Sequence, residues 1–340
     1  MAKREIAFIV NPISGVLNKA VFTENIPRYL DRDAFDYQIV YTERAGHAAE
    51  LARKFVTEGT DAVVAVGGDG TVNEIAGVLV HTGVAFGVMP CGSGNGLARH
   101  LRIPMDAAGA IRVLNRFQTK LLDYGKINDL PFFCTCGMGF DAFVSSKFAQ
   151  SEKRGALTYL ENMLREGLKY QPDTYEIMVE GDTVRHEAFL IACANASQYG
   201  NNALIAPHAS MSDGLMDVTI MEPFTVLEAP QIALQLFNGT LPQNNKIKTL
   251  RCKRISIRRS RSGYIHCDGE PLTAGTEINV QLIEKGLRMI VNTQPSEENV
   301  IEQTVSLLYE ELVAFGMDLH NRNIRKLEEI NKEMKRRLGI

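Results

Sequence analysis

The first 120 or so residues contain short apolar segments separated by helix-like patterns. Residues 6–10 (IAFIV), 61–66 (DAVVAV) and 85–89 (AFGVM) are almost continuously apolar, whereas residues 35–41 alternate between apolar and polar side chains. A helical pattern occupies residues 47–57. Strands that are apolar on both faces are typical of parallel sheets covered by helices on both sides. We therefore predict a three-layer α/β domain in the N-terminal part of the chain.

From about residue 123 the pattern changes to short alternating segments joined by turns. The Gly181-Asp182 pair lies between two such segments and predicts the turn of a β-hairpin. Helical patterns interrupt this region at residues 141–149, 156–169 and 225–238. We therefore expect a second, mostly antiparallel β domain.

A helical pattern fills the last segment, from residue 297 to residue 340. Because apolar residues recur on one face of these helices, we expect them to pack on the α/β domain. The chain then divides into an α/β domain of residues 1–123, to which residues 288–340 return, and a β-rich domain of residues 124–287. The alternative for the tail is a contact between two copies of the chain, which would make a homodimer.

Composition and charge exclude several classes of protein. The chain has 340 residues, enough for two domains, and its net charge of −3 gives no basic field for nucleic acid. The N-terminus enters a strand at once without a signal-peptide pattern, and no apolar run approaches the roughly 18 residues of a membrane-spanning helix. The six cysteines form no C-x-x-C pair. We therefore expect a cytoplasmic protein with reduced thiols.

Three loops rich in small residues follow predicted parallel strands. They are NPISG at 11–15, GGDGTVNE at 67–74 and PCGSGNG at 90–96. In open α/β sheets, ligands bind at the edge where the carboxyl ends of the strands lie. Glycines let a phosphate approach the backbone closely. One such loop is often only a tight turn, but three at one edge predict a phosphate-binding site.

The second loop lacks a lysine, and it matches neither the Walker pattern nor G-x-G-x-x-G. Thr71 and Glu74 have the spacing of a capping box, which predicts a helix that begins at Thr71. The N-terminus of that helix would supply positive potential to a phosphate. A bound Mg²⁺ ion would supply more, with Asp69 acting on it through water.

Two acidic turns carry further candidate chemistry. Asp268 and Glu270 flank a glycine, and either carboxylate could accept a proton from a substrate hydroxyl. Asp213, together with the carbonyl oxygens of Ser210 and Leu215, would suit Mg²⁺, which prefers oxygen ligands. An ordinary turn between strands is the alternative in both cases.

A basic stretch precedes the Asp268-Gly269-Glu270 turn. It contains Lys246, Lys248, Arg251, Lys253, Arg254, Arg258, Arg259 and Arg261. We expect much of it to be a solvated strand face, with Ile255 and Ile257 pointing inward. The alternative is attraction to an anionic bilayer, worth up to about 1 kcal/mol per residue close to the surface. His266, beside the acidic turn, is expected to be structural.

Together, GGDGTVNE, NP-x-SG, the P-x-GSGN loop, the DGLMDV turn and the DGE turn resemble the motifs of the diacylglycerol kinase catalytic-domain family, in the same order along the chain. That family includes soluble bacterial diacylglycerol kinases, sphingosine kinases and ceramide kinases. The resemblance covers about residues 4–293. It implies a two-domain fold with an ATP site in the cleft between the domains, and a peripheral association with the membrane that holds the lipid.

The resemblance also assigns roles to individual residues. The nucleotide site would comprise Asn11, Ser14, Gly15, Thr42, Gly67, Gly68, Asp69, Gly70, Thr71, Val72, Asn73, Glu74, Gly92, Ser93 and Asn95. The Mg²⁺ site would comprise Asp213 and the carbonyls of Ser210 and Leu215, supported through water by Asp123. Glu270 matches the proton acceptor, with Asp268 close by. Because GSGNGLARHL resembles the sphingosine-kinase loop as much as the bacterial form, the lipid acceptor stays open.

Three functions are therefore compared. The first is an ATP-dependent lipid kinase acting on a hydroxyl of diacylglycerol or of a sphingosine-like long-chain base. The second is a kinase of a soluble metabolite such as NAD, a class that shares only GGDGT. The third is a regulator that binds lipid or nucleotide without catalysis, which the presence of Asp69, Asp213, Asp268 and Glu270 disfavours.

Overall fold

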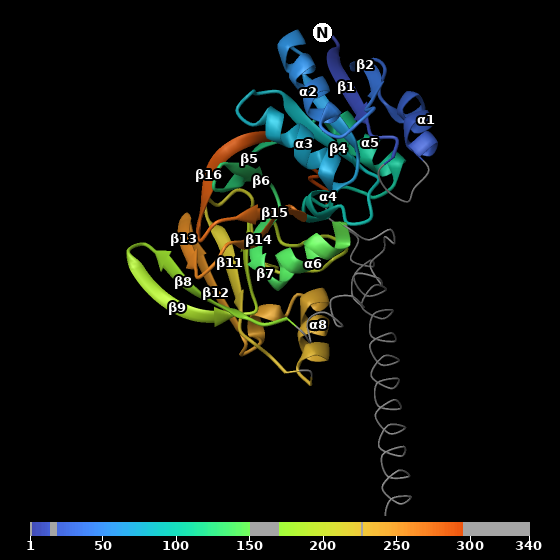
Figure 1. The fold of residues 1–340 in the computed structure, drawn as a ribbon. Coiled ribbons are helices and arrows are strands. Elements are labelled where there is room, and N and C mark those ends of the chain that lie inside the picture. Colours follow the sequence, from blue (N-terminus) through green and yellow to red (C-terminus); the bar gives the residue numbers. More distant parts are fainter. Residues whose placement is uncertain (1, 14–18, 150–169, 226, 295–340) are drawn as a thin grey trace, which may run out of the picture.

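The computed structural model describes residues 2–13, 19–149, 170–225 and 227–294 (Figure 1). Four of the sequence predictions lie outside these ranges. They are the helix at 156–169, the helical tail from residue 297 with its homodimer contact, and the roles of Ser14 and Gly15.

The N-terminal part is the predicted three-layer α/β arrangement. Its parallel strands lie in the order β2-β1-β3-β4 and comprise β1 (Arg4–Val10), β2 (Phe35–Tyr41), β3 (Ala62–Gly67) and β4 (Ala85–Pro90). Helices α2 (His47–Glu58) and α3 (Asp69–Leu79) pack together on one face, while α1 (Lys19–Tyr29) and α5 (Ala107–Arg116) pack together on the other (Figure 1). All residues of β3 and β4 are buried, as expected for strands covered on both faces.

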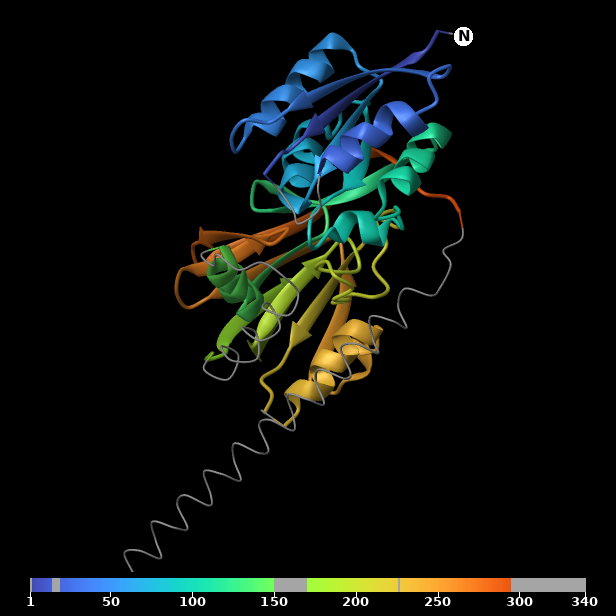
Figure 2. The same cartoon turned by 90° about the vertical axis from the view of Figure 1, so that its right-hand side faces the viewer.

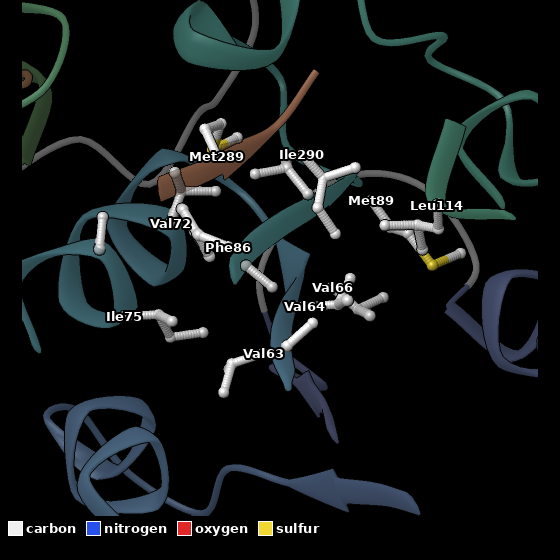
Figure 3. Packing of buried hydrophobic residues seen from close by; sticks show 14 of the residues in the cluster. Val63, Val64, Val66, Val72, Ile75, Phe86, Met89, Leu114, Met289 and Ile290 are labelled. Carbon is white, nitrogen blue, oxygen red and sulfur yellow. The ribbon is translucent and has the colours of Figure 1, made fainter. Parts of the chain in front are cut away.

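This sheet continues into the second half of the molecule through one long strand, β16 (Glu277–Ile290). Its end pairs with β4 at Met289, and its start pairs with β13 (Arg254–Arg259). On its other edge, β5 (Thr119–Ile127) pairs with both the start and the end of β16. Figure 3 shows Met289 and Ile290 among side chains of β3, β4 and α3. Beyond β13 follow β8 (Asp173–Val179) and β9 (Asp182–Ala188), while β6 (Leu130–Phe132) pairs with β5.

A second sheet is antiparallel throughout, with the strand order β12-β11-β10-β7-β14-β15. Its strands are β7 (Thr135–Gly139), β10 (Leu190–Ala194), β11 (Met216–Met221), β12 (Ile247–Cys252), β14 (Gly263–Cys267) and β15 (Glu270–Ala274). It packs on β8, β13 and the start of β16, which makes the predicted antiparallel domain a sandwich (Figure 2). Its other face carries a second apolar cluster with α6 (Phe140–Ala149) and α8 (Ala229–Asn238).

One local prediction, the position of a hairpin turn, needed correction. The turn between β8 and β9 is Glu180-Gly181, one residue earlier than predicted, and both residues have positive φ, 52° and 95°. Positive φ at both central positions is the mark of a type I′ hairpin turn. All six cysteines are buried. Among the described residues, no helix combines the length and apolarity needed to cross a bilayer.

Most of the basic stretch is paired with carboxylates, which favours the interpretation as a solvated strand face. The pairs are Lys246–Glu228, Lys248–Glu222, Arg251–Asp213, Lys253–Glu284, Arg258–Glu277 and Arg261–Asp173. Ile255 and Ile257 point inward as predicted. Because each of these cations has an acidic neighbour, the stretch presents little unbalanced positive charge to a bilayer.

Arg259, assigned to the exposed stretch by sequence, is instead buried and holds a hairpin together. Its guanidinium donates to the carbonyl oxygens of Gly263, Tyr264, Ala274 and Gly275 at 2.8–3.1 Å. These residues lie at the open end of the β14–β15 hairpin. Arg259 therefore ties the end of β13, in the first sheet, to a hairpin of the second sheet. Burial lowers the pKa of Arg259 below its ordinary value.

Candidate active site

The second glycine loop joins β3 to α3. The helix begins at Asp69, with Gly68 as an extended N-cap, so the predicted start at Thr71 and its capping box are wrong. Thr71 Oγ1 accepts a hydrogen bond from Asn11 Nδ2 at 3.0 Å, which links the first loop to the second. Glu74 Oε1 accepts from the Gly46 N–H at 3.2 Å.

The side chain of Asp69 binds the third loop to the second. One carboxylate oxygen accepts from the Asn95 N–H and the other from the Gly96 N–H, both at 2.8 Å. Burial raises the pKa of Asp69, and these two donors oppose the rise because they favour the charged form. Asn95 closes its own loop, with its side chain exchanging two hydrogen bonds with the backbone of Gly92. Asp69 is therefore engaged in holding two loops together.

The two loops touch through their glycines. A Cβ atom at Gly92 would lie 2.6 Å from the Cα of Gly68, a distance that real Cβ atoms do not tolerate. Only glycine therefore permits this backbone approach. Thr42, from the loop after β2, is buried and its N–H bonds to the Val10 carbonyl beside the first loop. Three of the predicted nucleotide segments thus meet at one edge of the sheet.

The Asp268-Gly269 turn connects β14 to β15 and has positive φ at both residues, 48° and 86°. Asp268 is half-buried, and its carboxylate accepts four hydrogen bonds. The donors are the N–H groups of Phe133, Cys134 and Thr135 and the side-chain amide of Asn73, at 2.7–2.9 Å. Burial raises the pKa of Asp268, and the four donors oppose that rise. The bond to Asn73 joins this turn to α3.

Glu270, two residues further on, is exposed and points toward the second glycine loop. Its Oε1 atom lies 3.7 Å from the position that a Cβ atom would occupy on Gly70. Glu270 therefore has a carboxylate beside the start of α3, whereas that of Asp268 is enclosed by donors. Two candidates that lie two residues apart in sequence thus have different surroundings: Glu270 is exposed, whereas the oxygens of Asp268 are occupied by four donors.

The predicted Mg²⁺ residues lie around a different turn. Asp213 Oδ2 is paired with Arg251, and its Oδ1 accepts from the Leu215 N–H at 3.2 Å. Asp123 accepts from the N–H groups of Gly214 and Lys285, at 3.0 and 2.7 Å. Within the described ranges, no group of three or more His, Cys, Asp or Glu side chains could hold a metal ion. In this arrangement Asp213 forms an ion pair with Arg251, and the Mg²⁺ site of Asp213 with the Ser210 and Leu215 carbonyls stays a prediction.

Comparison with known proteins identifies the family. The model "Diacylglycerol kinase catalytic domain" matches residues 5–127, and "YegS C-terminal NAD kinase beta sandwich-like domain" matches residues 134–291. A Chromohalobacter salexigens protein named "Probable lipid kinase YegS-like" is 31% identical over 68% of this chain and 76% of its own. The chain belongs to the diacylglycerol kinase catalytic-domain family.

Two further comparisons cover a similar share of the chain. A Mycobacterium tuberculosis protein named "Diacylglycerol kinase" is 26% identical over 74% of this chain and 84% of its own length. The crystal structure of a diacylglycerol kinase from Bacillus anthracis superposes with a TM-score of 0.65 at 20% identity, covering 85% of this chain and 97% of that one. The family fold thus accounts for both halves of the described structure.

The sequence reasoning missed the loop that follows β10, from Asn195 to Asn202. Asn195 Nδ2 donates to the carbonyls of Asp123 and Phe133, both at 2.9 Å, and thereby orients the segment that binds Asp268. Gly200, Asn201 and Asn202 have positive φ in succession and lie against the third glycine loop. The Gly-Asn-Asn run after an apolar strand was the available signal, since these residues favour left-handed conformations.

Two basic residues of α4 (Gly96–His100) also lie behind the third loop. Arg99 Nε donates to the Gly94 carbonyl at 3.0 Å, and burial lowers its pKa. His100 Nδ1 accepts from the Ser197 N–H at 3.1 Å and lies 3.0 Å from the Ser197 hydroxyl. Burial lowers the pKa of His100 to about 4. These contacts connect the α/β part of the site to the loop after β10.

Proposed function

We propose that this chain is an ATP-dependent lipid kinase, which transfers the γ-phosphate of ATP to a hydroxyl of diacylglycerol or of a sphingosine-like long-chain base. The observation that carries the proposal is the meeting of two motifs about two hundred residues apart. Glu270 faces Gly70 at the start of α3, and Asp268 binds Asn73 of the same helix. A carboxylate beside a phosphate-binding loop is the arrangement that transfer to a hydroxyl requires.

The nucleotide side is built from backbone. The first N–H groups of α3 have no partner within the helix, and the positive end of the helix dipole lies at the same place. Asn11, Asp69 and Asn95 hold the three loops in contact, so the phosphates meet an ordered set of donors. Mg²⁺ would arrive with ATP and neutralise charge on the transferring group.

The acceptor side is assigned to Glu270. Its carboxylate accepts the proton of the lipid hydroxyl while the hydroxyl oxygen forms a bond to the γ-phosphorus. The bond from the γ-phosphorus to the bridging oxygen breaks, and ADP leaves with that oxygen. Asp268, whose oxygens already accept four hydrogen bonds, holds the turn in place.

The test is transfer of labelled γ-phosphate from ATP to an acceptor panel of diacylglycerol and long-chain bases in mixed micelles, with NAD as the soluble alternative. We expect a phosphorylated lipid. Glu270→Gln should lower kcat about 100- to 10,000-fold, the usual contribution of a general base, with ATP affinity unchanged. The control is Glu277→Gln, an exposed residue paired with Arg258.

Each alternative has a distinct outcome in this panel. Phosphorylation of NAD alone would favour the soluble-metabolite kinase. Binding of ATP with no transfer to any acceptor would favour a non-catalytic regulator. Full turnover by Glu270→Gln would remove Glu270 from the role of base. Co-sedimentation with vesicles containing the accepted lipid would test the proposed membrane association.

A further inference from the structure

A buried carboxylate connects the two sides of the candidate site. Asp141 lies in the first turn of α6, and its Oδ2 atom is 3.0 Å from His266 Nε2 and 3.1 Å from the Tyr199 hydroxyl, which donates to it. Both Asp141 and His266 are almost fully buried. No role in the reaction proposed above uses either of them.

On the acceptor side, the connection runs through His266. The Gly269 N–H donates to His266 Nδ1 at 3.4 Å, which places the ring proton on Nε2 and directs it at Asp141. Gly269 lies between Asp268 and Glu270. The imidazole therefore fixes the turn that carries Glu270.

On the nucleotide side, the connection runs through Tyr199. The loop that begins there packs on the third glycine loop, and the Asn201 N–H donates to the Gly94 carbonyl at 3.1 Å. A Cβ atom at Gly200 would lie 3.0 Å from the Cα of Gly94, and one at Gly96 would lie 3.3 Å from the Tyr199 carbonyl oxygen. These contacts leave the loop after Tyr199 little freedom to move relative to the third glycine loop.

The neighbouring strand leaves space for this pair. A Cβ atom at Gly137, in the middle of β7, would lie 2.4 Å from Asp141 Oδ2 and 2.8 Å from His266 Nε2. Glycine weakens the interior of a strand, and often marks a place where another group approaches closely. Glycine at position 137 therefore leaves room for the contact between Asp141 and His266.

We propose that Asp141 is a positioning residue that sets the turn of Glu270 relative to the third glycine loop, through His266 on one side and Tyr199 on the other. The inference rests on the proposed kinase function, because its benefit is the alignment of the base with the phosphates. It assigns no contact between Asp141 and substrate.

Kinetics provide the first test. Asp141→Asn preserves volume but places an NH₂ group either at the Oδ2 position, facing both donors, or at the Oδ1 position, facing the Ala142 N–H. It should lower kcat about 10- to 100-fold, as losses of supporting residues do, with the KM for ATP little changed. In a Glu270→Gln background the same substitution should cost less than about 3-fold, because residues that act as a unit are non-additive. Equal losses in both backgrounds would overturn the proposal. The control is Asp106→Asn, whose carboxylate caps α5 and accepts from the Gly109 N–H rather than from a glycine loop.

Hydrogen exchange provides the second test and does not depend on activity. Tyr199→Phe removes a hydrogen bond on the loop side only, yet it should speed amide exchange in a peptide spanning residues 267–271. Unchanged exchange in that peptide would overturn the coupling. If the wild-type chain phosphorylates no acceptor, the proposed function fails, and the exchange experiment still decides whether Asp141 couples the two segments.

Discussion

Replacement of Arg259 tests whether this residue of the basic stretch stabilises the β14–β15 hairpin. In Arg259→Met the side chain keeps much of its apolar length but loses the guanidinium. The carbonyl oxygens of Gly263, Tyr264, Ala274 and Gly275 then lose their donor. Each hydrogen bond from a charged donor contributes about 1.5 to 3 kcal/mol. The cost of burying the guanidinium, several kcal/mol, offsets part of this sum.

We therefore expect Arg259→Met to lower the free energy of unfolding by about 3 kcal/mol. The matched control is Arg258→Met, next to it in sequence. Arg258 is exposed and paired with Glu277, so its loss should cost no more than about 1 kcal/mol. The chain has no tryptophan, so urea unfolding should be followed by far-ultraviolet circular dichroism. Equal losses of unfolding free energy in the two variants would refute the conclusion that the buried Arg259 stabilises the hairpin.

Three other perturbations have defined outcomes. Asp268→Asn should destabilise the chain by about 2 to 4 kcal/mol, because an amide cannot satisfy all four donors; a wild-type urea midpoint would contradict this. Gly92→Ala should weaken ATP binding at least about 10-fold by forcing the loop away from Gly68, whereas Gly275→Ala, which has open space, should not; titration calorimetry compares them. His100 has a pKa of about 4 when folded and about 6.5 when unfolded. The part of the unfolding free energy that depends on His100, about 3 kcal/mol, should therefore be present above pH 6.5 and lost as the pH falls to 4. His100→Gln should flatten the dependence of stability on pH in that range, and an unaltered dependence would show that His100 does not cause it.

The parts of the fold that depend on local pattern could be predicted from sequence. Buried strands, glycine loops and alternating segments each carry their signal within about ten residues. The DGE turn was visible for the same reason, since Asp-Gly favours a type I′ turn. What the sequence could not assign was which carboxylate is accessible. The donors to Asp268 come from Asn73 and from residues 133–135, which only the fold brings to it.

Two errors arose from local patterns. The capping box at Thr71 fits the local spacing, but Gly68 adopts an extended conformation, and the helix begins two residues earlier. Arg259 looks like its neighbours in sequence, and only strand pairing shows that it points between the sheets. For Arg259 a tertiary contact decided between alternatives that the local pattern left open.

Strand β16 affects the order in which the chain can fold as it leaves the ribosome. Its residues 287–290 pair with β5, and Met289 pairs with β4. Strand β4 is synthesised about two hundred residues before this part of β16. Until then, the edges of β4 and β5 that β16 will cover remain unpaired. The nucleotide half therefore completes its sheet only after nearly all of the β sandwich has been made. A chain that stops short of residue 290 exposes an unpaired sheet edge, which is a feature that the folding chaperones of the cell bind.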